Sequence, residues 1–384
     1  MKLLFLDQSS NLGGAELCLA DIAYPYRHNS LVAVFNEGPF PDYLRQRQIP
    51  VQTLIDDTIQ VQKSSGALAG IKSLNRLLPL ILKVSQLSRS YDLIYANTQK
   101  ALVVGAIAGV LSRRPVVYHL HDIVSPDHFS ATNRRIIVGL ANRARLVIAN
   151  SHASKEALVE AGGREDHVHV VYNGFCSQTY AVSQSDRAAL RESLQIEDDQ
   201  FVVGHFSRLS PWKGQHVLVE ALKQVPEHVV ALLVGDALFG EDDYVQQLKA
   251  QIKASSLQHR VKFLGFRTDI PQLMAACDLV AHTSTAPEPF GRVIVEGMLC
   301  HRPVVAANAG GATELIDHGQ TGWLTPAGDV QTLAEVLLSC CGKREDASRI
   351  AHRGYLKACQ RFSLEHTNAQ IQQRLEQAIA HKLY

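Results

Sequence analysis

Short apolar runs alternate with helix-like segments along almost the whole chain. Turn residues bound the runs, which are rich in Val, Ile and Leu, as is typical of strands buried on both faces of a parallel sheet. We expect strands in the first half at 2–6, 30–35, 51–55, 93–97, 115–120, 145–150 and 168–172, and in the second half at 201–206, 230–235, 261–264, 279–283 and 303–307. The pattern predicts an α/β protein with two doubly wound, Rossmann-like domains facing a cleft. Such domains bind ligands beyond the carboxyl ends of their strands.

A polar stretch at residues 173–185 separates the two halves. We therefore expect an N-terminal domain over residues 1–178 and a C-terminal domain over residues 179–362, with a new helix near Asp186. The last segment, about 363–384, carries apolar residues at helical spacing. These are Leu364, Ile371, Leu375 and Ile379.

Composition excludes several classes of protein. The 384 residues carry a formal charge of +1, without the basic excess of a nucleic-acid-binding protein, so no nucleic-acid partner is expected. Seven cysteines without a CxxC motif argue against a disulfide framework and a structural zinc site, and favour a reducing compartment. The longest apolar stretch, 101–111, is too short to cross a bilayer, and the N-terminal apolar run is too short for a signal peptide. These features predict a cytoplasmic protein.

Basic residues are concentrated in the first half, where residues 1–180 carry a net charge of +4. They gather in two stretches, 63–89 and 134–145, which include Lys63, Lys72, Arg76, Lys83 and Arg89, and Arg134, Arg135, Arg143 and Arg145. The first stretch also carries a helix-like apolar stripe, so it could lie peripherally on the inner face of an anionic membrane. It could equally be an ordinary packed helix with a solvated basic face, and Pro79 interrupts it.

Two carboxylates, Glu288 and Glu296, are separated by seven residues in the second half. A helix is expected to start at Gly291, which places Glu288 on the preceding loop and Glu296 in the second helical turn. Free N–H groups around Phe290 and Gly291 would suit a phosphate, and the carboxylates would suit vicinal hydroxyls. The alternative is a surface loop with an acid that the helix dipole favours.

Arg208 and Lys213 follow the strand 201–206, and the helical pattern resumes at Gln215. A guanidinium and an ammonium on one loop suit a diphosphate, although two solvated surface cations would give the same pattern. Another strand-to-helix loop carries Gly310 and Gly311, which would allow a ligand to approach the backbone closely.

The first half supplies a matching turn, Gly13 and Gly14, after its first strand. This turn is not GxGxxG, and the chain contains no P-loop motif, which disfavours a nicotinamide or flavin site and excludes a P-loop nucleotidase. His121 follows the strand 115–120, at the expected cleft edge, although a structural histidine would also fit. His119 is given no role, and no His, Cys or Asp cluster shows metal-ligand spacing.

Taken together, these motifs closely resemble the family 4 retaining glycosyltransferases, which have the GT-B fold. The resemblance covers nearly the whole chain: GGAE at 13–16, HD at 121–122, NS at 150–151, YNG at 172–174, SRLSPWKG at 207–214, GF at 265–266, the two glutamates of 288–296, GGATELI at 310–316 and TGWLTPAGD at 321–329. In this fold the last helix crosses back onto the first domain.

The resemblance implies transfer of a sugar from a nucleotide diphosphate sugar to an acceptor, which could be a glycan, a lipid-linked molecule or a small molecule. The anomeric configuration would be retained, and no metal or other cofactor would be needed. The first domain would bind the acceptor and the second the donor. By the family pattern Arg208 and Lys213 bind the diphosphate, Glu288 contacts the sugar hydroxyls, Glu296 contacts the ribose, and His121 binds the sugar near the reacting carbon.

The resemblance also implies supporting positions. Backbone groups of Gly14, Phe290, Gly291, Gly310 and Gly311 would contact the donor, and the turn of Gly265, Phe266 and Arg267 would hold the base, which could belong to a UDP-, GDP- or ADP-linked donor. Gly13, Asn97 and Asn150 would lie on the acceptor side. Arg292 departs from the common pattern, where an apolar or small polar residue is more frequent, and it could reshape the sugar or acceptor pocket.

Three other functions are compatible with this fold. The chain could be a non-catalytic protein that binds a nucleotide sugar or a partner, a nucleotide-sugar epimerase or a phosphorylase. An epimerase would show a different arrangement of catalytic acids, and a phosphorylase would be much longer. The presence of every charged motif residue favours the transferase.

Overall fold

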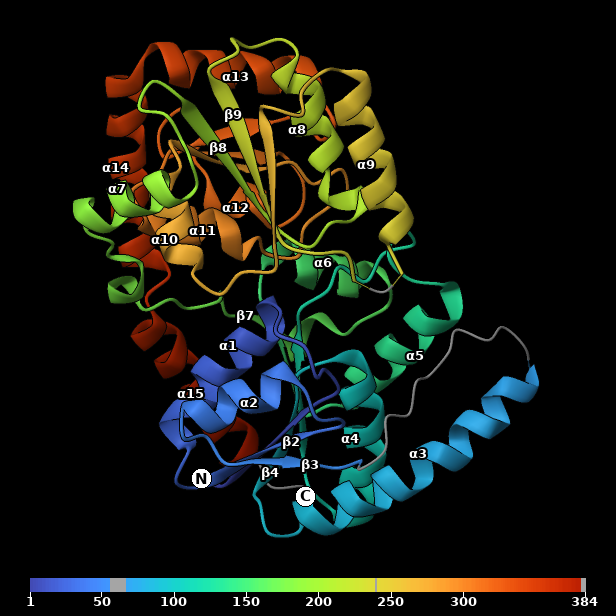
Figure 1. Ribbon diagram of the computed structural model, residues 1–384. Helices are drawn as coiled ribbons and strands as arrows, with labels where there is room; N and C mark the ends of the chain where they lie inside the picture. Colours follow the sequence, from blue (N-terminus) through green and yellow to red (C-terminus); the bar gives the residue numbers. More distant parts are fainter. Residues whose placement is uncertain (56–66, 239, 381–384) are drawn as a thin grey trace. The chain divides into compact units, whose positions relative to one another are not determined.

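The computed structural model describes residues 1–55, 67–238 and 240–380 (Figure 1). It divides into two compact units, Met1–Gly174 with Leu364–Tyr384, and Phe175–Ser363. The division follows Gly174, whereas the boundary expected from the sequence follows residue 178. The last segment of the chain groups with the first unit.

The first unit is built on a parallel sheet of seven strands in the order β3-β2-β1-β4-β5-β6-β7. The strands are β1 Leu3–Asp7, β2 Ser30–Val34, β3 Val51–Thr53, β4 Leu93–Ala96, β5 Val116–Leu120, β6 Leu146–Ala149 and β7 Val168–Val170. The helices are α1 Gly14–Ala23, α2 Pro39–Gln46, α3 Ala67–Ser88, α4 Gln99–Ser112, α5 Ala131–Ala141, α6 His152–Glu160 and α15 Leu364–Ala380.

Alternate residues of β1 pack into two different cores. Leu3 and Phe5 pack with residues of α1, α2 and α15, whereas Leu4 and Leu6 pack with residues of α3, α4, α5 and α6. Figure 1 shows α1 and α2 on one side of this sheet and α4 and α5 on the other. Both faces of β1 are therefore buried, which explains the near-continuous apolar run of this strand in the sequence.

The second unit contains a parallel sheet of six strands in the order β10-β9-β8-β11-β12-β13. The strands are β8 Phe201–Phe206, β9 Val229–Val234, β10 Val261–Gly265, β11 Leu279–His282, β12 Val304–Ala307 and β13 Trp323–Thr325. The helices are α7 Gln184–Ser193, α8 Gln215–Leu222, α9 Asp242–Ala254, α10 Ile270–Ala276, α11 Arg292–Leu299, α12 Ala312–Leu315, α13 Val330–Gly342 and α14 Arg344–Arg361.

The prediction of an α/β fold with two doubly wound domains is confirmed, and the structure corrects it at two places. The edge strand β13 was missed, because it is only three residues long and lacks an extended apolar run. Helix α3 continues through Pro79, where the sequence suggested an interruption. Among the helices that the structure describes, none has both the length and the apolar character needed to cross a bilayer.

Candidate functional site

The predicted donor-binding residues of the second unit lie on loops at one edge of its sheet. All strand pairs in this sheet are parallel, so the loops that follow β8, β11 and β12 leave the same edge. These loops carry Arg208 and Lys213, then Glu288, and then Gly310 and Gly311. Residues more than a hundred positions apart in the sequence are thereby brought together.

Lys213 and Glu288 form an ion pair. Lys213 Nζ lies 2.7 Å from Glu288 Oε2, and the two side chains are 15% and 13% exposed. The same carboxylate oxygen lies 3.2 Å from His282 Nε2 and 3.2 Å from Ser284 Oγ. Burial opposes the charged form of Glu288, but Lys213 and the His282 hydrogen bond outweigh it and lower the pKa of Glu288 well below its usual range. Glu288 is therefore suited to accept hydrogen bonds and not to donate a proton.

Arg208 lies on the same loop as Lys213, and both cations face the ring of Trp212. Lys213 Nζ lies 3.9 Å from the ring centroid and Arg208 Cζ lies 5.6 Å from it, within the range of cation–π attraction. Gln215, at the start of α8, donates from Nε2 to the Arg208 carbonyl at 2.9 Å. This hydrogen bond joins the two ends of the loop that carries the two cations.

Gly214 gives this loop its close contact with the end of β11. Its φ is +72°, and a Cβ at this position would lie 1.9 Å from the carbonyl oxygen of Thr283. Thr283 Oγ1 in turn donates to the Gly214 carbonyl at 2.7 Å and lies 3.0 Å from His205 Nε2. Burial lowers the pKa of His205 to about 3, so its ring is neutral and serves as a hydrogen-bonding support for the loop.

The glycine turn after β12 packs against the backbone of Glu288. The Gly311 N–H donates to the Glu288 carbonyl at 2.7 Å. Gly310 has a φ of +61°, and a Cβ there would lie 2.4 Å from the same oxygen. The turn therefore requires glycine for both conformation and space.

Helix α11 begins immediately after Gly291, as the sequence predicted, and Glu296 lies in its second turn. Glu296 Oε1 lies 3.4 Å from Arg292 Nη2 and 3.3 Å from the Tyr180 hydroxyl. The Arg292 guanidinium lies 4.5 Å from the ring centroid of Phe175. The unusual arginine of this motif is thus held by a carboxylate and an aromatic ring.

Phe290 contributes only its backbone to the edge of the sheet. Its side chain is buried and stacks on Phe175, with ring centroids 6.3 Å apart. The prediction that Phe290 and Gly291 supply backbone groups to a ligand stays a prediction.

The turn expected to hold the base follows β10. Gly265 has a φ of +65°, and the Phe266 N–H donates to Asp236 Oδ2 at 2.9 Å. Arg267 is paired with Asp269, with Nε 2.8 Å from Oδ1. The exposed Phe266 ring and main-chain groups therefore form the surface of the turn.

In the first unit, Asn97 connects Asp7 to His121. Asn97 Nδ2 donates to Asp7 Oδ2 at 2.7 Å and to the Ala15 carbonyl at 3.2 Å, and its Oδ1 lies 2.9 Å from His121 Nε2. Because a carbonyl can only accept, the Asn97 amide has one orientation, and His121 Nε2 must carry the proton. In the neutral ring, the lone pair then lies on the other ring nitrogen of His121, Nδ1.

The remaining predicted residues of the first unit lie at neighbouring strand ends. Gly13 and Gly14 begin α1 after β1. Asn150, directly after β6, is buried and accepts a hydrogen bond from Ser154 Oγ at 2.9 Å. Because β1, β4, β5 and β6 are consecutive in the sheet, these residues line up along one edge.

No role was predicted from the sequence for two buried carboxyl groups near the first strand-to-helix turn, those of Asp7 and Glu16. Burial, reinforced by nearby Glu16, raises the pKa of Asp7 to about 8. Burial also raises the pKa of Glu16. Near neutral pH, the proton on Asp7 limits the negative charge next to Asn97.

Other supporting residues were missed as well, although a signal existed for them. His282, Thr283 and Ser284 lie at the end of a predicted strand, as His121 does, and Asp236 follows another. The rule that ligands bind at carboxyl strand ends would have selected all four. Tyr180 had no such signal, because it ends the short 3-10 helix Ser177–Tyr180 before α7 and follows no strand.

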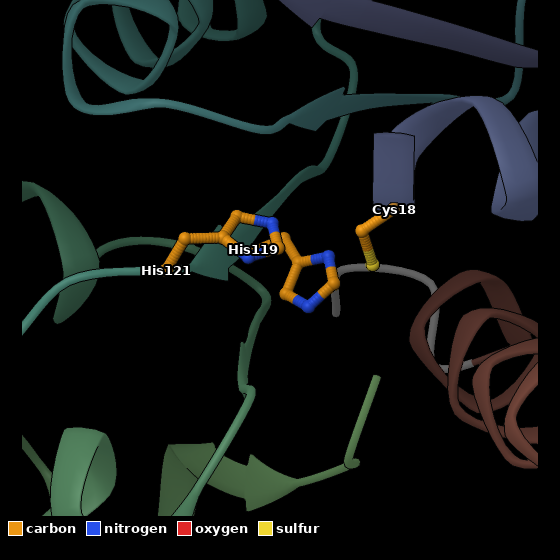
Figure 2. Close-up of side chains that lie close together, drawn as sticks. All are labelled: Cys18, His119 and His121. Atoms are coloured by element: carbon orange, nitrogen blue, oxygen red, sulfur yellow. The ribbon is translucent and has the colours of Figure 1, made fainter. Parts of the chain in front are cut away.

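One group of three side chains could hold a metal ion among the residues that the structure describes. Cys18, His119 and His121 place one ligand atom each within 4.8 Å of one another (Figure 2). Sequence spacing did not reveal this group, because Cys18 lies about a hundred residues before the histidines.

Comparison with known proteins agrees with this geometry. Residues 186–357 match the family Glycosyl transferases group 1, and residues 32–179 match Glycosyltransferase Family 4. The crystal structure of HepE from Anabaena, in complex with UDP and glucose, is 57% identical, has a TM-score of 0.92, and covers 98% of this chain and 100% of that chain. HepE has also been solved with UDP-glucose and with UDP.

Curated relatives are more distant. An uncharacterized glycosyltransferase of Methanocaldococcus jannaschii is 27% identical over 248 residues, covering 62% of this chain and 63% of its own length. D-inositol 3-phosphate glycosyltransferase of Jonesia denitrificans is 26% identical over 296 residues, covering 72% of this chain and 69% of its own length. Family models match both units, and the chain is similar to HepE along nearly the whole length of both proteins. The chain therefore belongs to the family 4 glycosyltransferases, with the GT-B fold.

Proposed function

We propose that the protein transfers a hexose from a UDP-linked donor to an acceptor hydroxyl, with retention of the anomeric configuration and without a metal ion. The observation that carries the proposal is the meeting of Lys213 and Glu288 with a glycine turn at one edge of the second sheet, on the loop where Arg208 and Lys213 face the same Trp212 ring. The complexes of HepE with UDP and UDP-glucose support a uridine nucleotide and a glucose-type sugar as the first donor to test.

The second unit binds the donor in this proposal. Arg208 and Lys213 bind the diphosphate and stabilise the negative charge that develops as UDP departs. Glu288, held as a carboxylate, accepts hydrogen bonds from sugar hydroxyls, and Glu296 accepts them from the ribose. The main chain at Phe290, Gly291, Gly310 and Gly311 supplies N–H groups, and the turn at Gly265, Phe266 and Arg267 receives the base.

The first unit binds the acceptor and contributes His121, with Gly14 contacting the donor and Gly13, Asn97 and Asn150 on the acceptor side. The lone pair on His121 Nδ1 suits it to accept a hydrogen bond from a sugar hydroxyl near the reacting carbon. The Asp7–Asn97–His121 chain of hydrogen bonds holds this tautomer in place.

The reaction follows from these roles. The acceptor oxygen forms a bond to the anomeric carbon on the face from which the phosphate oxygen departs, and the acceptor proton moves to that phosphate oxygen. Two fixed cations supply the charge stabilisation for which other transferases use a metal ion. No enzyme carboxylate acts as a nucleophile in this proposal, since Glu288 is engaged by Lys213, His282 and Ser284.

Thermal unfolding in the presence of nucleotides tests the donor site. UDP should raise the unfolding temperature more than GDP or ADP at equal concentration, and the shift should be the same with Mg²⁺ and with a chelator. Nuclear magnetic resonance of the product formed from UDP-α-glucose should show an α linkage. A shift that needs Mg²⁺ or a β-linked product would contradict the proposal.

We also propose that the first unit contacts an anionic membrane. Exposed apolar side chains occur on three helices that pack consecutively, α3 with α4 and α4 with α5. They are Leu78, Leu82, Ile107, Val110, Leu111 and Ile136, and exposed arginines of the same region include Arg89, Arg113, Arg135 and Arg143. Apolar side chains beside cations suit a surface that inserts between anionic headgroups.

The basic residues expected to make this contact are only partly available for it. Lys63 and the side chains of Lys72 and Arg76 lie outside the described residues. Lys83 donates from Nζ to the Leu54 carbonyl at 2.8 Å, and Arg145 donates from Nε to the Ala378 carbonyl at 3.3 Å. The exposed end of α4 is therefore the part of the surface on which the membrane proposal rests most directly.

A further inference from the structure

Cys18, His119 and His121 converge in the first unit from two separate elements (Figure 2). Cys18 is the fifth residue of α1, and the histidines lie at the carboxyl end of β5. Val117 and Tyr95 belong to the core between the sheet and α1. His119 lies two residues after Val117 on the same strand, so its side chain is on the same face of the sheet. Cys18 and His119 are 3% and 1% exposed, whereas His121 is only partly buried.

The hydrogen bonds of the two rings prepare them to bind a cation. Nδ1 of His119 lies 2.8 Å from the hydroxyl oxygen of Tyr95. The other ring nitrogen, Nε2, is buried and has no hydrogen-bond partner among the described residues. A buried polar atom without a partner costs about 1–3 kcal/mol, a cost that a ligand would remove. His121 binds Asn97 through Nε2 and keeps the lone pair on Nδ1.

We propose that Cys18, His119 and His121 bind a Zn²⁺ ion. One thiolate and two imidazoles form a donor set that zinc prefers, and three protein ligands leave a fourth position for water. Tyr95 and Asn97 orient the two rings from outside the ligand set, as is usual for zinc-bound histidines. Cys18, which donates to Asn173 Oδ1 at 3.3 Å in this structure, releases its proton to solvent when the metal binds.

Binding of zinc has a consequence for the transferase, and this consequence rests on the proposed function. The lone pair of His121 cannot serve a metal ion and a donor hydroxyl at the same time. Zn²⁺ at this site therefore inhibits sugar transfer, and it is no part of the transfer chemistry. Occupation of the site itself does not depend on the transferase proposal.

Cobalt is the probe for the site, because a Co²⁺–thiolate bond gives a charge-transfer absorption in the near ultraviolet. The chelator-treated full chain is titrated with Co²⁺ and then with Zn²⁺. We expect one Co²⁺ per chain, a charge-transfer band and displacement by Zn²⁺. Cys18→Ser should abolish the band, and His119→Gln should weaken binding at least about 100-fold while the band remains at saturating Co²⁺.

Cys341→Ser is the matched control. Cys341 Sγ lies 3.1 Å from His228 Nε2, and the described residues add no third ligand to this thiol–imidazole pair, so the loss of Cys341 should leave the band unchanged. Circular dichroism checks that each variant is folded, and His119→Gln tests the site if Cys18→Ser does not fold. A missing band in the wild type, or a band lost in Cys341→Ser and kept in Cys18→Ser, would overturn the proposal. Stoichiometric binding without inhibition by Zn²⁺ would refute only the role of His121 in transfer.

Discussion

Lys213 Nζ and Glu288 Oε2 lie 2.7 Å apart, although 75 residues separate them in the sequence. The pair fixes the position of a cation and the charge of a carboxylate at the same strand edge. It also means that the charge of Lys213, half of the expected diphosphate-binding charge, is balanced by Glu288 before a ligand arrives. The pair therefore connects diphosphate binding to sugar binding.

The low pKa of Glu288 predicts a specific loss of stability in acid. A group whose pKa is lower in the folded protein stabilises the fold above its unfolded pKa, about 4.3, and loses this effect as pH falls below that value. The unfolding temperature of the wild type should therefore fall more steeply below pH 5 than that of Glu288→Gln. At neutral pH the variant should be destabilised by about 2 kcal/mol in urea, because Lys213 loses its charged partner.

Glu335→Gln, which changes an exposed carboxylate on α13, is the control for this comparison. It should keep the acid dependence of the wild type. Equal slopes for wild type and Glu288→Gln would show that the buried ion pair does not govern acid stability.

The raised pKa of Asp7 predicts the opposite pH dependence. A carboxyl group whose pKa is raised in the folded state stabilises the fold fully below its unfolded pKa, about 3.9, and this contribution is lost as pH rises through about 8. Asp7→Asn, which carries no titratable proton, should flatten the decline in unfolding temperature between pH 4 and pH 8. Asp127→Asn, an exposed change in the same unit, should not, and a flattening in both variants would refute the assignment to Asp7.

Substitution of Gly214 separates steric from conformational effects in the loop that carries the cations. Gly214 and Gly319 have nearly the same φ, +72° and +73°, but a Cβ meets the Thr283 carbonyl at 1.9 Å only at Gly214, whereas nothing lies within 4 Å at Gly319. Gly214→Ala should weaken UDP binding at least about tenfold by displacing Lys213. Gly319→Ala should cost only about 1 kcal/mol of stability, from backbone strain, and leave UDP affinity unchanged. Isothermal titration of both variants measures this, and equal affinities would contradict the expected displacement.

Co-sedimentation with vesicles tests the membrane surface. Val110 and Leu111 are 78% and 51% exposed at the end of α4. The double variant Val110→Glu with Leu111→Glu should reduce binding to anionic vesicles at least about tenfold, since each apolar side chain that is buried contributes about 1.5 kcal/mol or more. Leu356→Glu, on α14 of the second unit and as exposed as Leu111, should bind like the wild type. Binding that is no stronger to anionic than to neutral vesicles would remove the membrane proposal.

The fold could be predicted because its strands are buried on both faces. Runs such as 201–206 and 230–235 are typical of such strands, and the turn residues around them set their lengths. The three-residue strand Trp323–Thr325 was not predicted, because a strand at the edge of a sheet does not need a continuous apolar run. Helix α3 passes Pro79 because its neighbour α4 packs along it, and tertiary packing offsets the local cost of proline.

The sequence predicted the individual residues of the site, loop by loop, but not the contacts between residues of different loops. Arg208, Lys213 and Glu288 were each visible, because charged residues at strand ends need a reason to be there. Their pairing could not be deduced, since it depends on how β8 and β11 lie next to each other. The same limit concealed the metal-ligating group, because Cys18 reaches His119 only through the packing of α1 on the sheet.

Release of UDP from UDP-glucose by the Arg208→Ala and Lys213→Ala variants tests the central claim most directly. Water serves as the acceptor, so that no acceptor need be known, and Lys223→Ala, which removes an exposed lysine paired with Glu220, is the matched control. We predict turnover reduced about 10²–10³-fold in each of the first two variants and unchanged in the control. Near-normal turnover of folded Arg208→Ala would contradict the account of this site as one that stabilises a departing diphosphate.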